Sequence, residues 1–314
     1  MNAAAPRQDV YERVNNRIVE MLEAGIGICD QLWARGPQQL PKRWNGEPYR
    51  GVNCILLWCD MMERGFSVPI YMTYKQAQEL GGQVQKGAKS AFSVYADKIT
   101  KMETDAKGEE VERHIPFLKS YAVFPVELID GLPARFYAKP EAPKLLELPN
   151  RLMAVDAFVR NAGAKVEERG DRAFYSPGRD LIVMPPYERF KDREAFASVL
   201  LHETVHFTGH ESRLNRPMKD YGTDIVARAE EEIVAEVGSA FLCATLEITP
   251  DTRPDHAAYV ASWLKAVKSD KRYFVRGAAA AQKAADYLYS LQPAAVTPAP
   301  SATQAAILPE LSPS

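Results

Sequence analysis

The spacing of apolar residues along the first half of the chain predicts a mixture of helices and short strands. Apolar side chains recur at steps of three and four residues from Val10 to Leu22, and Gly25 and Gly27 end this pattern, so a first helix is expected there. Two further helical patterns run from Val52 to Glu63 and from Thr73 to Leu80. Runs rich in β-branched and aromatic residues predict strands at Ala91–Tyr95, Ser120–Val126 and Phe136–Tyr137.

Polar and proline-rich segments divide this pattern. The charged insertion between Thr100 and His114 separates two of the strands and is expected to be a hairpin or a mobile loop. Residues 138–150, AKPEAPKLLELPN, are rich in proline and interrupt the apolar pattern, which favours a domain boundary there. We therefore expect an α+β domain over residues 1–139, a second domain over 140–292 and a disordered tail over 293–314.

The second domain is predicted to be mainly helical with a small β-sheet. A helix is expected at about Arg151–Ala162, and the runs AFY and LIVM, joined by the turn SPGRD, predict two strands between Arg172 and Pro186. The next helix should run from Asp192 to Phe207. Asp192 is a good N-cap, an apolar stripe follows it, and Gly209 ends the pattern.

Composition places the chain among ordinary globular proteins. Of its 314 residues 46% are hydrophobic and 25% charged, which excludes a single small disulfide-stapled module. The longest apolar run, Cys54–Cys59, is far shorter than the ~20 residues of a membrane span, and the N-terminus lacks a signal-peptide pattern, so we expect a cytoplasmic protein. The four cysteines form no CxxC pair, which favours buried thiols over disulfides or thiolate metal ligands.

The net charge of −2 excludes a histone-like polycation, but charge is unevenly distributed along the chain. Residues Arg35 to Lys101 hold ten basic side chains and five acidic ones. This window could present a cationic surface to an anionic polymer. Charge alone nevertheless favours the simpler interpretation of solvated lysines on a mixed surface.

The sequence HETVH at His202–His206 is the most specific chemical signal in the chain. Two histidines four residues apart lie one above the other on a helix, so both imidazoles can reach one ion, and Glu203 projects beside them. Catalytic zinc normally takes three protein ligands and keeps a fourth position open. A third ligand is therefore expected downstream.

Two residues downstream of His206, His210 and Glu232, are candidates for the third ligand. The metzincin pattern requires a histidine where this chain has Ser212, which excludes that scheme. His210 follows the helix-ending glycine, where it is better placed to line the cleft than to coordinate. Glu232, with Glu236 four residues on, resembles the segment of metallopeptidases in which a glutamate completes the site. We prefer the ligand set His202, His206 and Glu232, with Glu236 holding the far nitrogen of a ligand histidine.

Helical phase supports Glu232 only in part, because runs of glutamate usually form solvated helix faces. At about 100° per residue, the apolar residues around Ile233 define the core side, with Glu236 near its border and Glu232 next to it. Glu231 points more nearly away from the core. Glu230 falls close to the apolar arc, which the phase does not explain and which leaves a different ligand open.

With a metal bound, Glu203 is expected to be the general base toward the attacking water while the metal polarises the carbonyl, so the predicted reaction is amide hydrolysis. The strand Asp180–Met184 just precedes the active helix, where such enzymes keep an edge strand that pairs with an extended peptide. His210, Tyr187 and Tyr221 are candidates for the donor that stabilises the oxyanion.

Longer segments carry a family resemblance. In the first domain they are LPKRWNGEPYRGVNCILLW (Leu40–Trp58), MTYKQAQELGGQVQKGAKS (Met72–Ser90) and IPFLKSYAVFPVELIDGLP (Ile115–Pro133). In the second they are LLHETVHFTGHESRLNR (Leu201–Arg216), EEIVAEVGSAFLCATL (Glu231–Leu246) and YVASWLKAVKSDKRYF (Tyr259–Phe274). In this order they resemble the ArdC-type antirestriction proteins of conjugative plasmids, whose N-terminal part is shared with TraC-type plasmid primases. The chain departs from the family pattern at Ala88 and at Phe124-Pro125, away from the metal site.

The resemblance implies a first domain that binds single-stranded DNA without sequence specificity, a gluzincin-like metallopeptidase domain, and protection of incoming plasmid DNA from host restriction during conjugation. Zinc is the expected metal, with manganese or another divalent ion as an alternative, and a restriction-system component is one candidate for the unknown protein substrate. Single strands are held by basic side chains along the phosphates and aromatic rings under the bases. Residues of both kinds in the first domain are Arg35, Lys42, Arg43, Trp44, Tyr49, Arg50, Lys75, Lys86 and Lys89.

Three further residues of the first domain have less specific interpretations. Trp58 lies in an apolar helix and is expected in the core. Asn53 and Gln76 are equally compatible with a DNA contact and with structural capping.

Three functional hypotheses follow from these residues. The first is an antirestriction factor that joins a DNA-binding module to a zinc-dependent peptidase. The second is a DNA-binding coat whose peptidase fold is structural or recruits a partner, and protection that survives Glu203→Ala would favour it. The third is a protease that acts on proteins bound or crosslinked to DNA, which cleavage stimulated by single strands would favour.

Overall fold

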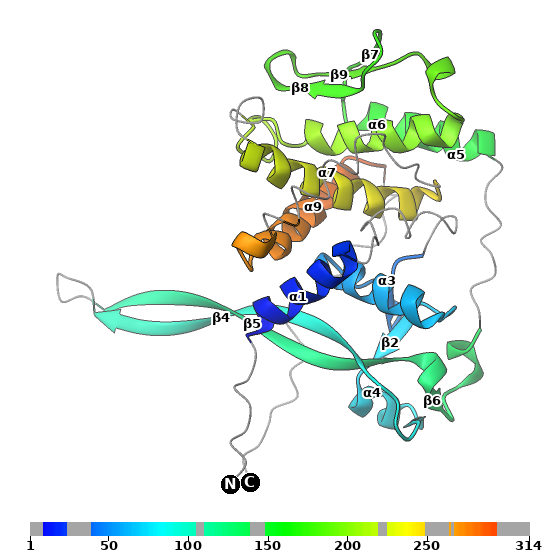
Figure 1. Ribbon diagram of the computed structural model, residues 1–314, viewed down its shortest axis with the longest axis vertical. Coiled ribbons are helices and arrows are strands. Elements are labelled where there is room, and N and C mark those ends of the chain that lie inside the picture. The colour runs from blue at the N-terminus through cyan, green and yellow to red at the C-terminus, as the bar shows by residue number, and fades with distance from the viewer. Residues whose placement is uncertain are drawn as a thin grey trace.

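The computed structural model describes residues 9–23, 39–104, 110–138, 148–218, 225–248, 264 and 267–293. In Figure 1 the elements up to β6 form the lower half of the molecule, and the elements from α5 onward form the upper half. Arg35, most of the segment proposed as a domain boundary and the tail expected after Pro293 lie outside the described residues.

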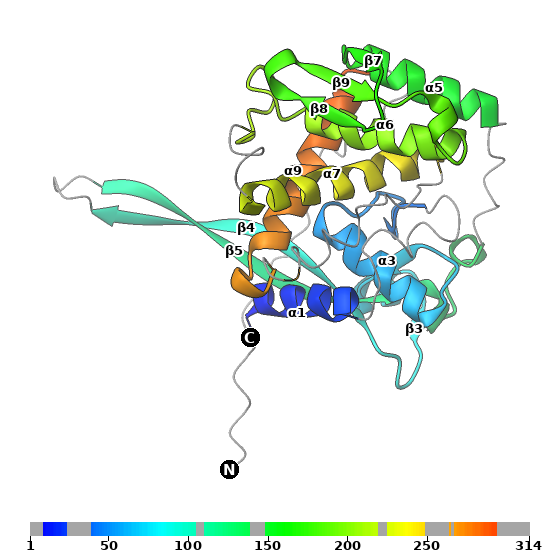
Figure 2. The same cartoon turned by 45° about the horizontal axis from the view of Figure 1, so that its top comes forward.

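The lower half is built around a four-stranded sheet in the order β1-β2-β5-β4. Its strands are β1 (Lys42–Arg43), β2 (Ile70–Met72), β4 (Ala91–Thr104) and β5 (Glu110–Pro125). β1 is parallel to β2, whereas β5 is antiparallel to both β2 and β4. The strands expected at Ala91–Tyr95 and Ser120–Val126 are parts of one long hairpin, which extends from the body as an arm in Figures 1 and 2. The described ends of the charged insertion, residues 100–104 and 110–114, are therefore paired strands of a hairpin, one of the two alternatives expected.

Three helices of the lower half confirm the periodicity of the sequence. They are α1 (Val10–Glu23), α3 (Val52–Arg64) and α4 (Tyr74–Glu79). Gly65 ends α3 with a φ of 71°, a left-handed conformation that glycine adopts without a Cβ clash. Gln76 completes a capping box with Thr73, and the Asn53 side chain bonds both the N–H and the carbonyl of Val94. Of the two alternatives for Asn53 and Gln76, the structure thus favours the structural role.

A second, two-stranded sheet pairs β3 (Gln83–Val84) with β6 (Ile129–Asp130) over a small apolar core of its own. The strand expected at Phe136–Tyr137 is wrong, because Ala134–Phe136 form a single 3-10 turn. The hydroxyl of Tyr137 donates to the Ile129 carbonyl at 2.6 Å and accepts from the Leu132 N–H at 2.9 Å. These side-chain hydrogen bonds close the turn and take the place of strand pairing.

The upper half is mainly helical with a small sheet, as predicted. Its helices are α5 (Leu148–Asn161), α6 (Arg193–Phe207), α7 (Ile225–Leu246) and α9 (Tyr273–Ser290). Its sheet has the order β7-β9-β8, formed by β7 (Val166–Glu168), β8 (Phe174–Ser176) and β9 (Leu181–Met184).

The expectation that the strand before α6 is an edge strand is wrong. β9 lies in the centre of the sheet, where it is parallel to β7 and antiparallel to β8. The exposed β7 sequence Val-Glu-Glu has no strand signal, so this partner could not be anticipated from the pattern. Among the described strands, β8 forms the antiparallel edge of this sheet.

One apolar core joins the two halves. Buried side chains of α1 and α3 belong to the same cluster as those of α5, α6, α7 and α9, and α9 contacts both α7 and α3. Trp58 is buried as predicted, with its ring 6.1 Å from the ring of Phe241 in α7. At the same junction Arg50 pairs with Asp286, and the Gly51 N–H donates to the Gln282 side chain at 2.9 Å.

Two expectations from composition can be compared with the described residues. Cys54, Cys59 and Cys243 are free and buried, and burial raises the pKa of all three thiols, as expected of inert core cysteines. None of the described helices is both long enough and apolar enough to cross a membrane.

Candidate metal centre

α6 carries the HETVH segment, and a side chain fixes where it begins. The Asp192 carboxylate accepts a hydrogen bond from the Ala195 N–H at 2.8 Å, which satisfies one of the amides left unpaired in the first turn. This cap was predicted. It sets the phase of a helix whose second half, from Leu200 to Phe207, is buried throughout.

The other end of α6 differs from the expected glycine cap. The helix ends at Phe207, with Thr208 as its C-cap, and Gly209 does not adopt a left-handed conformation. A Cβ on Gly209 would lie 2.3 Å from the Met218 sulfur and 3.0 Å from the Arg216 guanidinium. Because the following loop packs directly against the end of the helix, a side chain at this position would force Met218 and Arg216 to shift.

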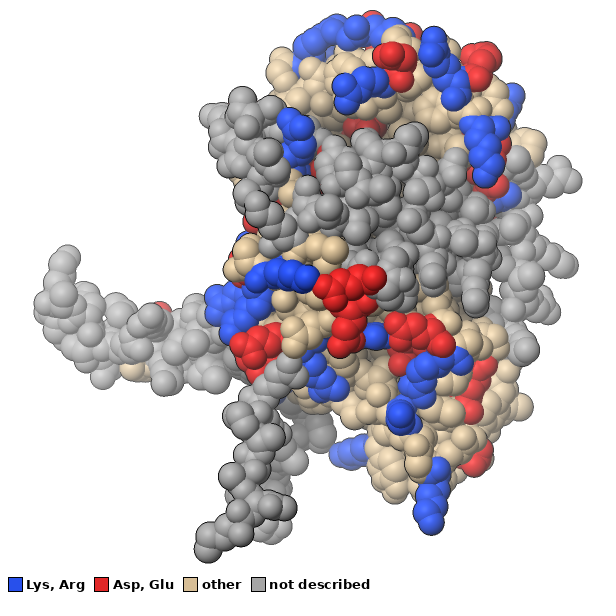
Figure 3. All heavy atoms as spheres, viewed as in Figure 1, with Lys and Arg blue, Asp and Glu red and all other residues tan. Residues whose placement is uncertain are grey.

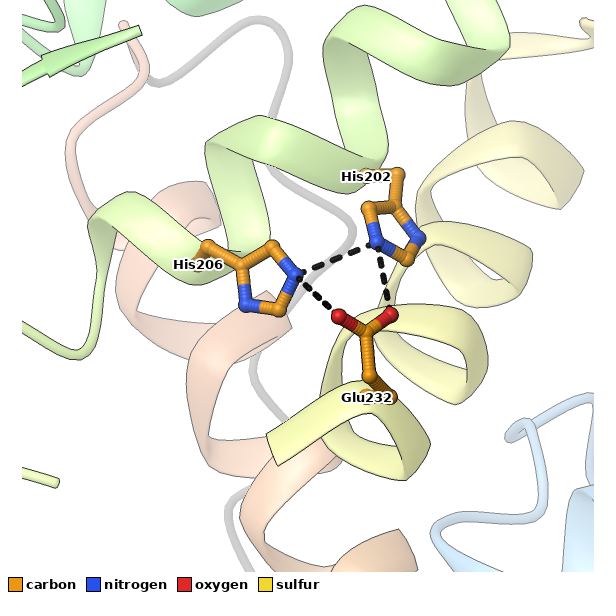
Figure 4. Close-up of side chains that lie close together, drawn as sticks. All are labelled: His202, His206 and Glu232. Atoms are coloured by element: carbon orange, nitrogen blue, oxygen red, sulfur yellow. Dashed lines mark hydrogen bonds and ion pairs between the residues drawn. The ribbon is translucent and has the colours of Figure 1, made fainter. Parts of the chain in front are cut away.

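Three side chains from α6 and α7 converge on one point (Figure 4). The Nε2 atoms of His202 and His206 are 3.1 Å apart, and the Glu232 oxygens lie 3.5 Å from the first and 3.7 Å from the second. Ligand atoms about 2.0–2.1 Å from a tetrahedral zinc ion are roughly 3.3 Å apart, so the three donors are spaced as a metal requires. Their donor atoms all lie within 4.8 Å of one another.

The donor set suits a divalent cation. His202, Glu203, His206 and Glu232 are exposed by 2, 2, 3 and 1% respectively. Carboxylates so far from water need a nearby positive charge. Two imidazoles and one carboxylate are the ligands of many catalytic zinc sites, and they also bind other first-row divalent metals. Among the described residues this is the group that could hold a metal ion.

The Glu231 carboxylate and the Arg216 guanidinium lie on the Nδ1 side of His206, away from the ligand position. His206 Nδ1 lies 3.0 Å from the Glu231 carboxylate, which also accepts two hydrogen bonds from Arg216 at 2.7 and 2.8 Å. Burial alone would raise the pKa of Glu231, but the hydrogen bonds from Arg216 and His206 outweigh it and hold that pKa below its usual value. Burial would likewise lower the pKa of His206, but the bond to Glu231 and the carboxylates of Glu232 and Glu203 raise it.

The helical phase of α7 predicted the burial of only some of its acidic residues correctly. Glu236 lies 3.8 Å from His202 Nδ1, on the side where it was expected to support a ligand histidine. Glu231, expected to point away, is buried behind His206, and Glu230, expected near the core, is at the surface and pairs with Arg276 at 3.1 Å. The reason is that α7 packs against both α6 and α9, so nearly its whole circumference is buried and no single apolar arc exists.

The structure gives the surroundings of two of the remaining candidates, His210 and Tyr187. His210 is outside the metal-ligand group, and its Nδ1 is bonded within its own turn to Ser212. Tyr187 packs its ring against Phe196 in the first turn of α6. Tyr221 lies outside the described residues.

The residues expected to contact DNA are partly dispersed. Tyr49 is buried, and its hydroxyl bonds the Tyr71 carbonyl, so its ring is not available for stacking, contrary to expectation. Arg50 is held by Asp286 at the junction of the two halves. Lys42 and Arg43 form β1 and are half-buried, whereas Trp44, Lys75, Lys86 and Lys89 are exposed. Figure 3 shows basic and acidic side chains interspersed on the face viewed, with basic groups at its lower end, where Figure 1 places α4.

Besides Trp44, two tyrosines that the sequence argument did not name are exposed on the lower half. Trp44, Tyr74 and Tyr121 are exposed by 36, 43 and 38%. Trp44 follows β1 and Tyr74 follows β2, and these parallel strands end at the same edge because Arg43 is opposite Tyr71. β5 is antiparallel to β2 with Phe124 opposite Met72, so Tyr121 lies toward the same end of the sheet. Strand register, which the sequence does not reveal, brings the three rings to one end.

Family models match both halves of the chain. Residues 8–124 match the N-terminal domain of anti-restriction factor ArdC. Residues 153–281 match a zincin-like metallopeptidase domain, which contains all three metal-ligand candidates.

Individual relatives extend this likeness over most of the chain. The uncharacterized protein y4eC of Sinorhizobium fredii is 35% identical over 90% of this chain and 92% of its own length. Two DNA primases TraC from Escherichia coli are 34% and 32% identical, but the chain spans only 20% and 28% of their lengths. The crystal structures of antirestriction ArdC protein from plasmid R388, metal-free and Mn(II)-bound, are 38% identical, with TM-scores of 0.75 and 0.74, and both matches cover 90% of this chain and 98% of that one.

Proposed function

Because the chain belongs to the ArdC family of antirestriction proteins, we propose that it protects incoming plasmid DNA from restriction by joining a single-stranded DNA-binding half to a metal-dependent peptidase. The convergence of His202, His206 and Glu232 carries the enzymatic part of this proposal. The Mn(II)-bound relative supports a divalent ion, and we propose zinc as the ion used by this chain because two imidazoles and a carboxylate suit it.

The residues of the site support hydrolysis of a peptide bond. A divalent ion held by His202, His206 and Glu232 supplies Lewis-acid polarisation of the scissile carbonyl. Glu203 follows His202 on α6, and its buried carboxylate accepts a proton from the attacking water and returns it to the leaving amine. Glu231 lies 3.0 Å from His206 Nδ1 and Glu236 lies 3.8 Å from His202 Nδ1, on the sides of the rings away from the ligand position.

The order of strands in the upper sheet indicates which strand could pair with an extended substrate. An extended peptide gains affinity by pairing with a free strand edge. β9 has both edges occupied, so we propose β8, which contacts α6, as the strand that pairs with substrate. The side chains of β8 alternate, with Tyr175 buried and Phe174 exposed by 43%.

Exposed rings and lysines support binding of single-stranded DNA by the lower half. Trp44, Tyr74 and Tyr121 lie toward one end of the four-stranded sheet, and each base of a single strand offers a face on which such a ring can stack. Lys75 adjoins Tyr74, and Lys86 and Lys89 follow β3, whose Gln83 side chain bonds the Tyr74 hydroxyl at 3.1 Å. We propose these rings and lysines as the DNA contact, with Tyr74 and Tyr121 in place of Tyr49.

A binding titration tests the DNA contact. Fluorescent single-stranded and duplex oligonucleotides are titrated with the full chain at several salt concentrations, and their anisotropy is followed. We expect preferential, salt-sensitive binding of single strands, and a loss of about 1–3 kcal/mol for Tyr74→Ala or Tyr121→Ala. Phe174→Ala, at an exposed ring of the upper half, is the matched control. Equal affinity of all variants would remove these rings from the contact, and absence of binding would leave a free-standing metallopeptidase.

Conjugation into a restricting recipient tests the whole proposal. Transfer of a plasmid that encodes the wild type, Glu203→Gln or a His202→Ala, His206→Ala double variant is compared in restricting and non-restricting recipients. If peptidase activity protects the DNA, both variants should lose protection while retaining DNA binding. Full protection by both would instead support the DNA-binding coat with a structural peptidase fold. Cleavage of DNA-bound proteins that depends on single strands would support the third hypothesis.

A further inference from the structure

Arg216 and Glu231 form a buried ion pair beside the metal centre. Their side chains are exposed by 10 and 8%, and two hydrogen bonds join the guanidinium to both carboxylate oxygens. Removing two charges from water costs more than their attraction returns unless the other donors and acceptors are also satisfied. The remaining bonds of this pair therefore indicate what it is for.

Those remaining bonds link the two helices that carry the ligands. Arg216 donates to the Val205 carbonyl at 2.8 Å and to the Thr208 hydroxyl at 2.7 Å, both at the end of α6. Glu231 belongs to α7 and precedes Glu232. The absence of a side chain at Gly209 makes room for Arg216 in this position. The pair thus joins the last turn of α6 to α7 and leaves one Glu231 oxygen in contact with His206.

That contact determines which nitrogen of His206 faces the site. Glu231 Oε1 lies 3.0 Å from His206 Nδ1, and an ionised carboxylate only accepts hydrogen bonds, so Nδ1 carries the proton. Nε2 of the neutral ring then keeps its lone pair directed toward His202 and Glu232, 3.1 and 3.7 Å away. A guanidinium that bonds both oxygens keeps Glu231 from rotating and from acting as a donor.

We propose that Arg216 and Glu231 are positioning residues that fix the tautomer and rotation of His206 and thereby set the metal affinity. This inference rests on the proposed metal centre. Glu236, at 3.8 Å from His202 Nδ1, is farther from its histidine than Glu231 is from His206. Loss of Glu231 should therefore weaken metal binding more than loss of Glu236.

Metal affinity of the purified full chain tests the proposal. Zinc is titrated against a chromophoric chelator, and thermal unfolding of each metal-free variant is measured in parallel. Glu231→Gln should lower zinc affinity by about 10- to 100-fold, and Arg216→Lys should lower it too, because lysine cannot bond both carboxylate oxygens. Glu230→Gln is the matched control, since Glu230 is adjacent, exposed and paired with Arg276, and it should bind zinc as the wild type does.

Nitrogen NMR of the imidazole rings in the metal-free chain gives a readout that general destabilisation would not imitate. At a pH above the raised pKa of His206, where the ring is neutral, the wild type should show His206 protonated at Nδ1, and Glu231→Gln should shift the proton toward Nε2. Unchanged zinc affinity in both Glu231→Gln and Arg216→Lys would overturn the proposal, as would a neutral wild-type ring protonated at Nε2. If Glu231→Gln does not fold, Arg216→Lys decides by the same two measurements. Wild-type zinc affinity in the His202→Ala, His206→Ala variant would overturn the metal centre itself.

Discussion

At the scale of single residues, the metal centre is an arrangement of buried negative charge. Glu203, Glu231 and Glu232 are all buried, and a carboxylate in such a position is stable only beside a cation or strong hydrogen-bond donors. Arg216 provides this for Glu231. A divalent ion bound at Glu232 and the two histidines would provide it for the rest of the cluster, so binding of the ion and stability of the chain should be coupled.

Replacing Glu232 with Gln tests this coupling. The variant keeps the shape of the side chain but removes the charge that attracts the ion. A metal present at 100 times its dissociation constant stabilises the folded state by about 2.7 kcal/mol. Zinc should therefore raise the melting temperature of the wild type by several degrees, and EDTA should reverse the rise.

The Glu232→Gln variant should show a much smaller rise, as measured by thermal unfolding followed by circular dichroism. Glu230→Gln controls for loss of a neighbouring charge and should behave as the wild type. A full zinc-dependent rise in Glu232→Gln would show that the third ligand lies elsewhere.

At the scale of helices and strands, close packing of α9 on α7 holds Glu232, the candidate glutamate ligand, in place. A Cβ on Gly277 would lie 2.5 Å from Cγ2 of Ile233, the residue next to Glu232. The two helices can approach this closely only because Gly277 has no side chain. The position of Glu232 therefore depends on a glycine in a helix that holds none of the ligand candidates.

Gly277→Ala should separate these helices. Overpacking a filled core typically costs about 1–3 kcal/mol, which exceeds the roughly 1 kcal/mol that alanine gains over glycine in a helix. We expect a lower free energy of unfolding in urea, together with weaker zinc binding. In a double-mutant cycle, Gly277→Ala and Ile233→Ala together should cost less stability than the sum of their separate effects, because the clash is with that side chain. Additive effects of the two substitutions would argue against this contact.

The hairpin of β8 and β9 is fixed to the end of α6 by Arg213. This guanidinium bonds both oxygens of Asp180 and the Tyr175 hydroxyl, and it also donates to the Phe207 carbonyl at 2.6 Å. Asp180 has a φ of 47°, a left-handed conformation that asparagine also tolerates. Asp180→Asn is therefore a substitution that removes the charge without straining the backbone.

Stability of Asp180→Asn should depend on pH. The hydrogen bond from Arg213 lowers the pKa of Asp180, so its stabilising contribution is present above the pKa of the unfolded chain and is lost as the pH falls through the folded value. Because the side chain is 38% exposed, we expect a difference of only about 1 kcal/mol from the wild type at pH 7. This difference should disappear once the pH falls below the lowered pKa of Asp180 in the folded chain, and urea unfolding at a series of pH values measures it. A difference independent of pH would indicate that charge is not its cause.

At the scale of the whole molecule, the two halves share one core. Trp58 of α3 packs against Phe241 of α7, and Arg50 and Gly51 bond side chains of α9. Separation of the halves would expose the apolar faces of α1 and α3 to water. The boundary expected near residue 139 therefore separates the two proposed functions. The shared core argues against two independently stable folds.

A fragment of residues 1–139 should consequently fail to unfold cooperatively, whereas the full chain should show one main transition that includes both halves. Differential scanning calorimetry of both proteins tests this, with zinc added only to the full chain. The zinc-dependent increase in melting temperature should also extend to the environment of Trp58, which tryptophan fluorescence reports together with the other tryptophans. A cooperative transition in the fragment would contradict the shared core.

The sequence by itself determined the features that depend on local spacing and chemistry. The periodicity of α1, α3 and α6, the Asp192 cap and the HETVH motif all act within a few residues of one another, so their physics is readable without a fold. The helical phase of α7 also predicted that Glu232 lies near the core. The structure places it there, beside the two histidines.

Only the tertiary structure decided what depends on segments far apart in the chain. Burial of α7 on two sides placed Glu231 rather than Glu230 inside, and strand pairing put β9 in the centre of its sheet. Register brought Trp44, Tyr74 and Tyr121 toward one end while the core enclosed Tyr49. The physical reason is that burial and strand order are set by what packs against a segment, and for these segments the partners lie tens to hundreds of residues away.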